Sequence, residues 1–437
     1  MGRRFVFLMM CAGLFLCSPA KSCAQEGQAG GQNAPLGVED CVGIALENQP
    51  SVIAGREAVF ASRSRVGQAG ANYYPQVDLT AGYSRTHATP SSSRPSITAN
   101  QDFELYSGSV GLRQNIFDFG KTTAGVRVQE LNTDAFSADL RNTLAQTVFN
   151  VKQAYYGLLL SKKNAEVARE TVAQFEQHLL QARGFFETGA SPRFDVTKAE
   201  VDLSNAKVNL IRAENAVHIA MAGLKNAMGV PRAPDFEIVD SLAFDKYEIT
   251  LEEAVTRAFQ SRPDLKSAVA RRRAAEESVA LSKKDYYPEL AGNGAYNWSG
   301  GEFPLEEGWN AGVTLSLPLF SGFLTKYQVQ ESKANLKIAG ANESGVRQNL
   351  VFEVEQAYLN IKEAEKRVPA AELAVRQAVE NLELANGRYS AGVGSPLEVT
   401  DATVALINAR TAYIQALSDY RVAQASLERA MGEPVKY

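Results

Sequence analysis

The sequence predicts a mixed fold in which two β-hairpins of membrane-spanning length and two long antiparallel helical hairpins belong to one chain. Three observations predict it. Nearly the whole chain after the N-terminus is an internal duplication, each copy holds segments of alternating apolar and polar residues, and each copy holds a very long run with helical periodicity. No later stretch reaches about 18 uninterrupted apolar residues, so a membrane would be met by strands or through lipid.

The N-terminus has the features of a secretory signal peptide. Arg3 and Arg4 precede the short apolar run Phe5–Leu16, and Pro19 ends that run before a cluster of small residues suited to cleavage. Residues 1–24 are therefore predicted to be removed. The alternative is an anchor helix that is kept.

Cysteine usage fits an exported chain without disulfides. Cleavage leaves Cys41 as the one cysteine of the mature chain, so no intramolecular bridge can form, and we expect Cys41 to be buried on an apolar helix face. A second interpretation makes Cys23 a lipidated N-terminus. After the signal peptide, residues 25–36 are expected to be a linker to the first repeat.

Composition excludes several functional classes. The formal net charge is only -4 and no basic stripe is present, so nucleic acid is not expected as a partner. The three histidines, His87, His178 and His218, lack metal-ligand spacing. Because no glycine-rich phosphate loop or nucleophile elbow occurs either, we expect neither an enzyme nor a cofactor.

The duplication divides the chain into a first repeat over 37–235, a linker over 236–250 and a second repeat over 251–437. Tyr74-Pro75 recurs as Tyr287-Pro288, at an offset of 213, whereas the long helical segments match at an offset of 203. The first repeat therefore carries ten extra residues between these points, where a loop is expected.

Each repeat begins with two short helices, predicted over 38–72 and 251–285. Acidic residues in the first turn of the second copy complement the helix dipole, and Pro263 can begin the second helix of that pair.

A β-hairpin follows in each repeat, predicted over 75–117 and 288–320. Apolar residues alternate with small or polar ones on either side of a polar loop over 85–102, which indicates strands of about ten residues with one apolar face. The alternative is part of a soluble β-sandwich. Aromatic residues expected near the membrane interfaces are Tyr74, Tyr287, Trp298 and Trp309.

Long helical hairpins complete the repeats, predicted over 120–229 and 324–432. Residues 121–187 contain no proline and would form roughly 100 Å of helix. The corresponding helix of the second repeat is expected to be interrupted at Pro369. Helices of this length have no compact core of their own and must pack sideways against others.

Four strands cannot close a membrane barrel, because the smallest barrels have eight. Two chains would supply eight strands around a filled interior, and three would supply twelve around an open lumen. The small polar residues of the alternating segments favour the open lumen.

These features together resemble the TolC family of outer-membrane channel proteins. The resemblance rests on the duplication, on Tyr-Pro before each first strand, on the "PLFSG" sequence at 318–322 and on the glycine-containing turn before each return helix, and it covers about residues 37–434. It implies a homotrimer with a twelve-stranded β-barrel in outer-membrane lipid and a twelve-helix α-barrel in the periplasm. It also implies docking to a periplasmic adaptor and to an inner-membrane pump of RND or ABC type, for export of solutes or proteins.

The resemblance places Glu398 and Asp401 at a closed periplasmic constriction, where six carboxylates of a trimer would meet and attract cations. The alternative is that acidic residues near a helix N-terminus complement its dipole. Tyr389 matches a latch tyrosine of the family or is an aromatic wedge between helices. Gly394 stands where the family latch carries an arginine, which predicts a looser gate.

The turns between the long helices are the expected docking sites for the adaptor. Because the first turn carries Asp195 and Lys198 where the second carries two acids, two distinct grooves are expected. The docking residues are predicted to be Gly189, Ser191, Asp195, Gly392, Gly394 and Ser395. A different class of protein, a periplasmic helical-hairpin adaptor or stalk without a pore, would share the helices and lack lipid-facing strands.

Overall fold

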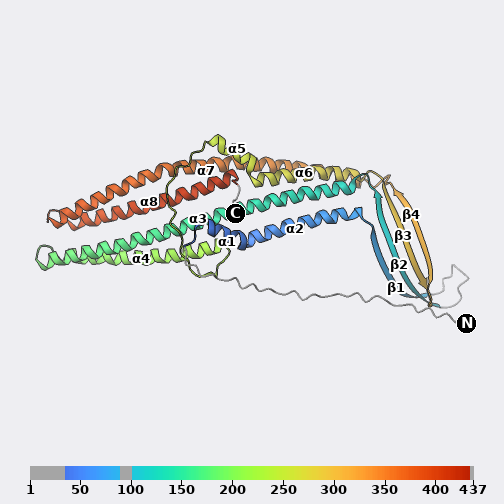
Figure 1. Cartoon of the computed structure of the whole chain (residues 1–437), viewed down its shortest axis with the longest axis horizontal. Helices are drawn as coiled ribbons and strands as arrows, with labels where there is room; N and C mark the ends of the chain where they lie inside the picture. Colours follow the sequence, from blue (N-terminus) through green and yellow to red (C-terminus); the bar gives the residue numbers. More distant parts are fainter. Residues whose placement is uncertain (1–34, 89–100, 434–437) are drawn as a thin grey trace.

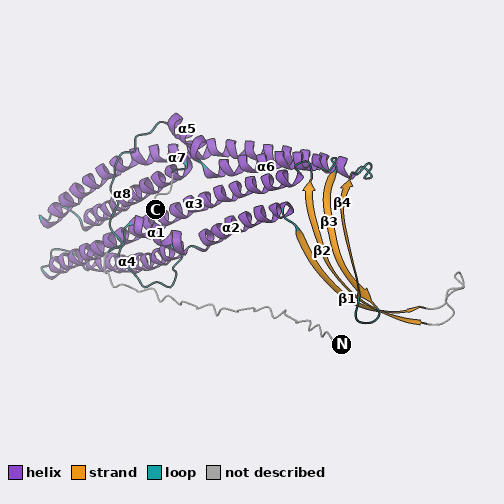
Figure 2. Cartoon of the chain, turned by 45° about the vertical axis from the view of Figure 1, so that its right-hand side comes forward, coloured by secondary structure: helices purple, strands orange, loops and turns teal. Residues whose placement is uncertain are grey.

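Long helices run the length of the molecule, and a four-stranded sheet lies at one end (Figures 1 and 2). The computed structural model describes residues 35–88 and 101–433. The predicted signal peptide and Cys23 lie outside these residues. None of the described helices combines the length and apolarity needed to cross a bilayer.

Each repeat begins with a pair of helices broken at a proline. In the first repeat α1 (Val38–Asn48) is followed by α2 (Pro50–Gly70) and a short 3-10 helix, η1 (Ala71–Tyr73). In the second, α5 (Leu251–Ser261) is followed by α6 (Pro263–Lys284). Proline fits the first turn of a helix, where its missing N–H has no partner to lose, so both breaks follow from the sequence.

The long hairpins are formed by α3 (Lys121–Glu187) with α4 (Arg193–Ala227), and by α7 (Leu324–Ser390) with α8 (Pro396–Met431). The expected interruption at Pro369 is wrong, because α7 continues through it. Neighbouring side chains such as Ile361 and Val368 are fully buried against other helices. Packing along the helix therefore outweighs the local cost of proline, which is about 3 kcal/mol.

The sheet contains β1 (Gln76–Ala88), β2 (Gln101–Phe117), β3 (Glu289–Gly300) and β4 (Glu306–Ser316), all antiparallel in that order. The expected strand length of about ten residues is too short for the first hairpin, because its strands have 13 and 17 residues. The ends of the expected polar loop over 85–102 continue the ladder instead, with Arg85 paired to Asp102 at 2.7 Å. Cross-strand charge pairs support pairing that hydrophobic alternation alone does not signal.

The strands and helices form three successive rows along the molecule, and each row contains four elements packed side by side. The sheet runs β1-β2-β3-β4, the helices next to it run α2-α3-α6-α7, and those at the far end run α4-α3-α8-α7 (Figure 1). Within the described chain every row is open, because its two outermost elements pack on one side only. The free edges are therefore β1 and β4, α2 and α7, and α4 and α7.

Two apolar cores lie near the middle of the molecule, where each repeat packs its first helix between its long helices. The segment between α4 and α5 crosses this region, and Leu36 forms a parallel bridge with Ile238. The Tyr155 hydroxyl donates to the carbonyl oxygen of Val239 at 2.7 Å, which ties the crossing segment to α3. Cys41 is fully buried in the first core as expected, and burial raises the pKa of its thiol to about 11.

Candidate functional site

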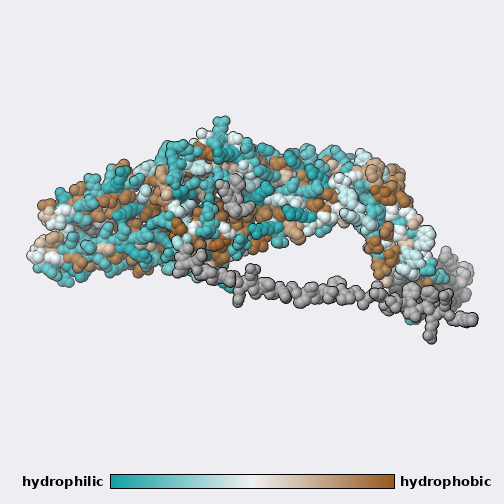
Figure 3. All heavy atoms as spheres, viewed as in Figure 1, coloured by the Kyte–Doolittle hydropathy of each residue, from teal (hydrophilic) through white to brown (hydrophobic). Residues whose placement is uncertain are grey.

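The strand register gives the sheet one apolar face. Val77, Leu79 and Tyr83 of β1 pair with Leu112, Val110 and Tyr106 of β2. The same rows continue across β3 and β4, where Tyr296 is opposite Trp309. Most of these side chains are exposed in the single chain, Leu79 at 75% and Trp309 at 76%, whereas Tyr106 and Val110 are half-buried. Figure 3 shows the brown hydrophobic surface on the strands.

The opposite face of the sheet is lined by small and polar residues. Thr80 and Ser109 share a hydrogen bond at 2.7 Å, and the side-chain amide of Asn297 donates to that of Asn310 at 3.3 Å. Their rows are filled largely by serine, asparagine, threonine and glycine. A strand with lipid on one side and water on the other has this pattern.

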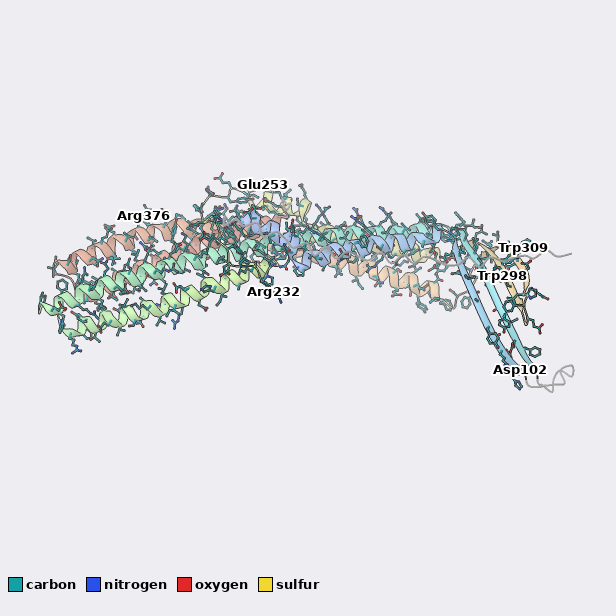
Figure 4. The ribbon with its side chains drawn as sticks, turned by 60° about the horizontal axis from the view of Figure 1, so that its bottom comes forward. Asp102, Arg232, Glu253, Trp298, Trp309 and Arg376 are labelled. Carbon is teal, nitrogen blue, oxygen red and sulfur yellow. The ribbon has the colours of Figure 1, made fainter. Side chains whose placement is uncertain are left out.

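The apolar face extends along β2 from Phe117 to Tyr106. At about 3.4 Å per residue and the usual tilt of membrane strands, this length spans roughly 25 Å, the height of an outer-membrane apolar band. Beyond Tyr106 the same face carries charged residues that include Glu104 and Asp102. Figure 4 shows Asp102 at the far end of the sheet, with Trp298 and Trp309 between it and the helices.

The four aromatic residues predicted at membrane interfaces all lie on the strands or beside them. Tyr74 and Tyr287 stand just before β1 and β3, exposed at 71% and 51%, and Tyr287 stacks on Phe119. Trp298 and Trp309 belong to the apolar face of the sheet. The first two therefore mark the helix end of the strands, and the two tryptophans lie within the apolar face.

At the other end of the molecule, Glu398 lies in the first turn of α8. Its backbone N–H donates to the Ser395 hydroxyl at 3.3 Å, and its carboxylate accepts from the Ser395 backbone at 3.4 Å. Arg388, at the end of α7, donates to the same carboxylate at 3.1 Å. The arginine and these capping bonds hold the pKa of Glu398 below its ordinary value.

Asp401 lies one turn further along α8, on the same exposed face as Glu398. Val399 and Ala402, on the other side of the helix, are buried. Asp401 has no ion-pair partner among the described residues. The structure thus brings the two acids together on one surface, and it engages Glu398 in capping, which was the alternative interpretation.

Tyr389 is not on that surface. Its side chain is 5% exposed and lies among Ala385, Val399 and Ala402. The ring of Phe185, from α3, contacts it edge-on at 5.3 Å. In this conformation Tyr389 is a wedge between the helical hairpins.

Glycines shape both turns. Gly189 and Gly392 have the left-handed backbone, with φ of +77° and +73°, which L-residues with a side chain rarely adopt. A Cβ on Gly394 would stand 2.9 Å from the backbone nitrogen of Tyr389. A side chain at position 394 therefore does not fit unless the backbone of this turn moves.

The first turn presents a different set of groups. Asp195 is half-buried in the first turn of α4, and Lys198 forms an ion pair with Asp202 at 3.1 Å. The backbone N–H of Ser191 donates to the carbonyl oxygen of Phe185 at 3.2 Å, which closes the end of α3. The two turns thus differ in charge as the sequence indicates.

Sequence reasoning missed three residues near these turns. His178 was regarded only as an isolated histidine, although its ring contacts that of Tyr389 at a tilt, with ring centroids 5.5 Å apart. Arg388 and Phe185 were not considered. Arg388 directly precedes Tyr389 and faces Glu398 across a glycine turn, a spacing from which the ion pair could have been suggested.

Comparisons with known proteins agree with this arrangement. The family model described as outer membrane efflux protein matches residues 42–230 and 254–433, one match in each repeat. The chain is 25% identical to the outer membrane protein TolC of Vibrio cholerae over 406 residues, covering 89% of each chain. It is 24% identical over 409 residues to the alkaline protease secretion protein AprF of Pseudomonas aeruginosa, covering 90% of this chain and 83% of the relative.

Among solved structures, the fold is similar to that of the Campylobacter jejuni CmeC outer membrane channel. The TM-score is 0.80 at 18% identity, and the match covers 90% of this chain and 85% of the other.

Proposed function

Because the chain belongs to the family of outer membrane efflux proteins, we propose that it forms the outer-membrane exit duct of an efflux pump or of a type I secretion system. The duct conducts substrates passively from an inner-membrane pump through the periplasm and across the outer membrane. One observation carries the proposal: three open rows of four elements are stacked along one axis, and the row of strands has one apolar and one polar face.

Three copies of the chain would close every row at once. Twelve strands are enough to leave a lumen, whereas the eight strands of a dimer would fill it with side chains. The free edges of the far row carry exposed apolar residues on α4 and α7, the helices that would meet between copies. These residues are Phe194, Val201, Val208, Ile211 and Ile219 on α4, and Phe352, Leu359, Leu373 and Leu384 on α7.

The constriction of the closed duct would lie at the second turn. Glu398 and Asp401 are exposed on one face of α8, and threefold symmetry would set six carboxylates around the axis. Such a ring attracts cations and opposes anions. Tyr389 would act from behind this ring by packing the hairpins together.

Docking of a periplasmic adaptor would use the ends of both hairpins. The residues concerned are Gly189, Ser191 and Asp195 at the first turn and Gly392, Gly394 and Ser395 at the second. Their different charges support two grooves, with Arg388 and Glu398 paired at one and Lys198 and Asp202 at the other. The adaptor in turn would join the duct to an RND or ABC pump, which supplies the energy and selects the cargo.

Single-channel conductance of the purified protein in a planar bilayer tests the duct. Discrete, cation-selective openings from a trimer are expected. Silence from folded protein that stays silent after Glu398→Gln with Asp401→Asn would overturn the proposal in favour of a periplasmic stalk. Cross-linking of the same sample checks the trimer independently of conduction.

A further inference from the structure

The two helical hairpins of one protomer meet near their turns through an aromatic contact that contains a buried histidine. His178 of α3 is 6% exposed, and its Nδ1 has no hydrogen-bond partner among the described residues. The hydroxyl of Tyr389, on α7, is likewise buried and unpartnered. Buried polar atoms in proteins usually have a hydrogen-bond partner. Two buried polar atoms without one in the same contact therefore call for an explanation.

This contact is part of the joint between the hairpins near their turns, which also contains a hydrogen bond from the Thr400 hydroxyl of α8 to the Asp202 carboxylate of α4 at 3.4 Å. Phe185 and His178 both come from α3, and both pack on Tyr389, which in turn lies against the α8 residues Val399 and Ala402. No hydrogen bond joins the His178 and Tyr389 side chains. The two rings therefore meet by van der Waals contact, and His178 must be neutral to be buried there at low cost.

We propose that His178 and Tyr389 form a proton-sensitive latch: neutral His178 holds the hairpins together near their turns, and protonation of His178 releases them. This inference rests on the proposed function, because release of the hairpins matters only if they surround a conduction path.

The charges around His178 do not offset its burial. On α4 it faces Asp195, Asp202 and Lys198, and the last two form an ion pair with each other. On α7 and α8 its neighbours Leu382, Asn386, Val399 and Thr403 carry no charge, and Tyr389 is neutral. On α3 the nearby ions are already paired, Glu176 with Lys207 and Arg183 with Glu200. Desolvation accordingly lowers the pKa of His178 below its ordinary value of 6.5, although Asp202 and Asp195 oppose it.

A cleft of about 440 Å³ beside the histidine gives water a route to the joint. It is lined by polar groups from α3, α7 and α8, which include Gln174, Gln181, Asn386 and Thr403. Loosening of the joint would let this water solvate a charged imidazole. The released state can therefore hold the proton that the packed state rejects.

The sign of the pH dependence follows from the lowered pKa. Well above pH 6.5 His178 is neutral in both the packed and the released state, and the latch has its full strength. As the pH falls, the released state takes up the proton first, and the latch weakens until the pH passes the lowered pKa of the packed state. Each unit of difference between the two pKa values shifts the equilibrium about tenfold per protomer.

The test is conductance of the trimer in planar bilayers between pH 7.5 and pH 5. We expect the open probability of the wild type to rise at least severalfold on acidification. His178→Gln and His178→Phe, which cannot take a proton, should lose this rise, whereas His218→Asn, at an exposed histidine of α4, should keep it. Two different replacements guard against a variant that simply fails to assemble, which gel filtration would reveal.

Two outcomes would overturn the latch: a wild type whose open probability does not change with pH, or a rise that persists unchanged in both His178 variants. Either can occur in a protein that conducts, so failure of the latch is distinguishable from failure of the duct. The His178 variants also separate the latch from the carboxylate ring, because both variants keep Glu398 and Asp401 and would keep any pH response that the ring supplies.

Discussion

Gly432 leaves no room for a side chain against Arg262: a Cβ on Gly432 would lie 2.8 Å from the Arg262 Cα. The same relationship holds in the first repeat, where a Cβ on Gly229 would lie 2.8 Å from the carbonyl carbon of Asn48. Each repeat thus seats the end of its last helix in the break between its first two helices. Both repeats therefore contain this close glycine contact, although the residues around it differ.

Replacement of either glycine by alanine should destabilise the protein. Both have the left-handed backbone, with φ of +74° and +71°, which costs a residue with a side chain about 1–2 kcal/mol before any clash is counted. We expect Gly229→Ala and Gly432→Ala to lower the thermal midpoint of the trimer by several degrees. Gly43→Ala, within α1 where a Cβ meets nothing, is the matched control and should be neutral or slightly stabilising. Equal thermal midpoints for all three variants would contradict the role assigned to Gly229 and Gly432.

The two faces of the sheet should respond oppositely to charge. Leu79→Lys places an ammonium on the apolar face and should cost about 2–4 kcal/mol at mid-membrane depth, reducing the yield of assembled trimer. Thr80→Lys, the adjacent residue on the polar face, should assemble normally and reduce cation selectivity. Heat-modifiable mobility on gels measures the first effect and reversal potentials the second. Normal assembly of Leu79→Lys would show that this face does not meet lipid.

Neutralising the proposed constriction should ease conduction. Glu398→Gln with Asp401→Asn removes up to six negative charges from the ring in a trimer, so conductance should rise and block by multivalent cations should weaken. Single-channel recording with and without added cation measures both. If conductance and block match the wild type, the ring does not line the pore.

Arg388→Ala should change cation block in the other direction. The ion pair with Glu398 is exposed to solvent, so its loss should change the free energy of unfolding very little. The freed carboxylate should bind cations more tightly and strengthen the block. Because Arg388 lowers the pKa of Glu398, its removal raises that pKa, and the block should disappear at a higher pH than in the wild type. Cation block is measured against pH in the variant and the wild type. The same midpoint pH in both would show that Arg388 does not affect the protonation of Glu398.

Sequence patterns predicted the helices and strands well where those elements are determined by residues close together in the chain. The absence of proline between Lys121 and Glu187 and the short-range periodicity of that run correspond to the bounds of α3. Alternation likewise identified the apolar face of the strands, because side chains in a strand alternate whatever surrounds them. Pro369 and the ends of the first hairpin were mistaken because distant contacts, the burial of α7 and the pairing of Arg85 with Asp102, outweigh local preference there.

By itself the sequence determined the duplication, the two long hairpins, the four strands and the acidic pair on one face of α8, since each depends on spacing along the chain. Only the tertiary structure decided the order of elements in the three rows, the ion pair of Arg388 with Glu398, and the meeting of His178 with Tyr389. Those two rings belong to different repeats, and nothing in the periodicity of either helix says which helix lies beside it. Packing of the hairpins against each other makes that choice, and with it decides which histidine is buried.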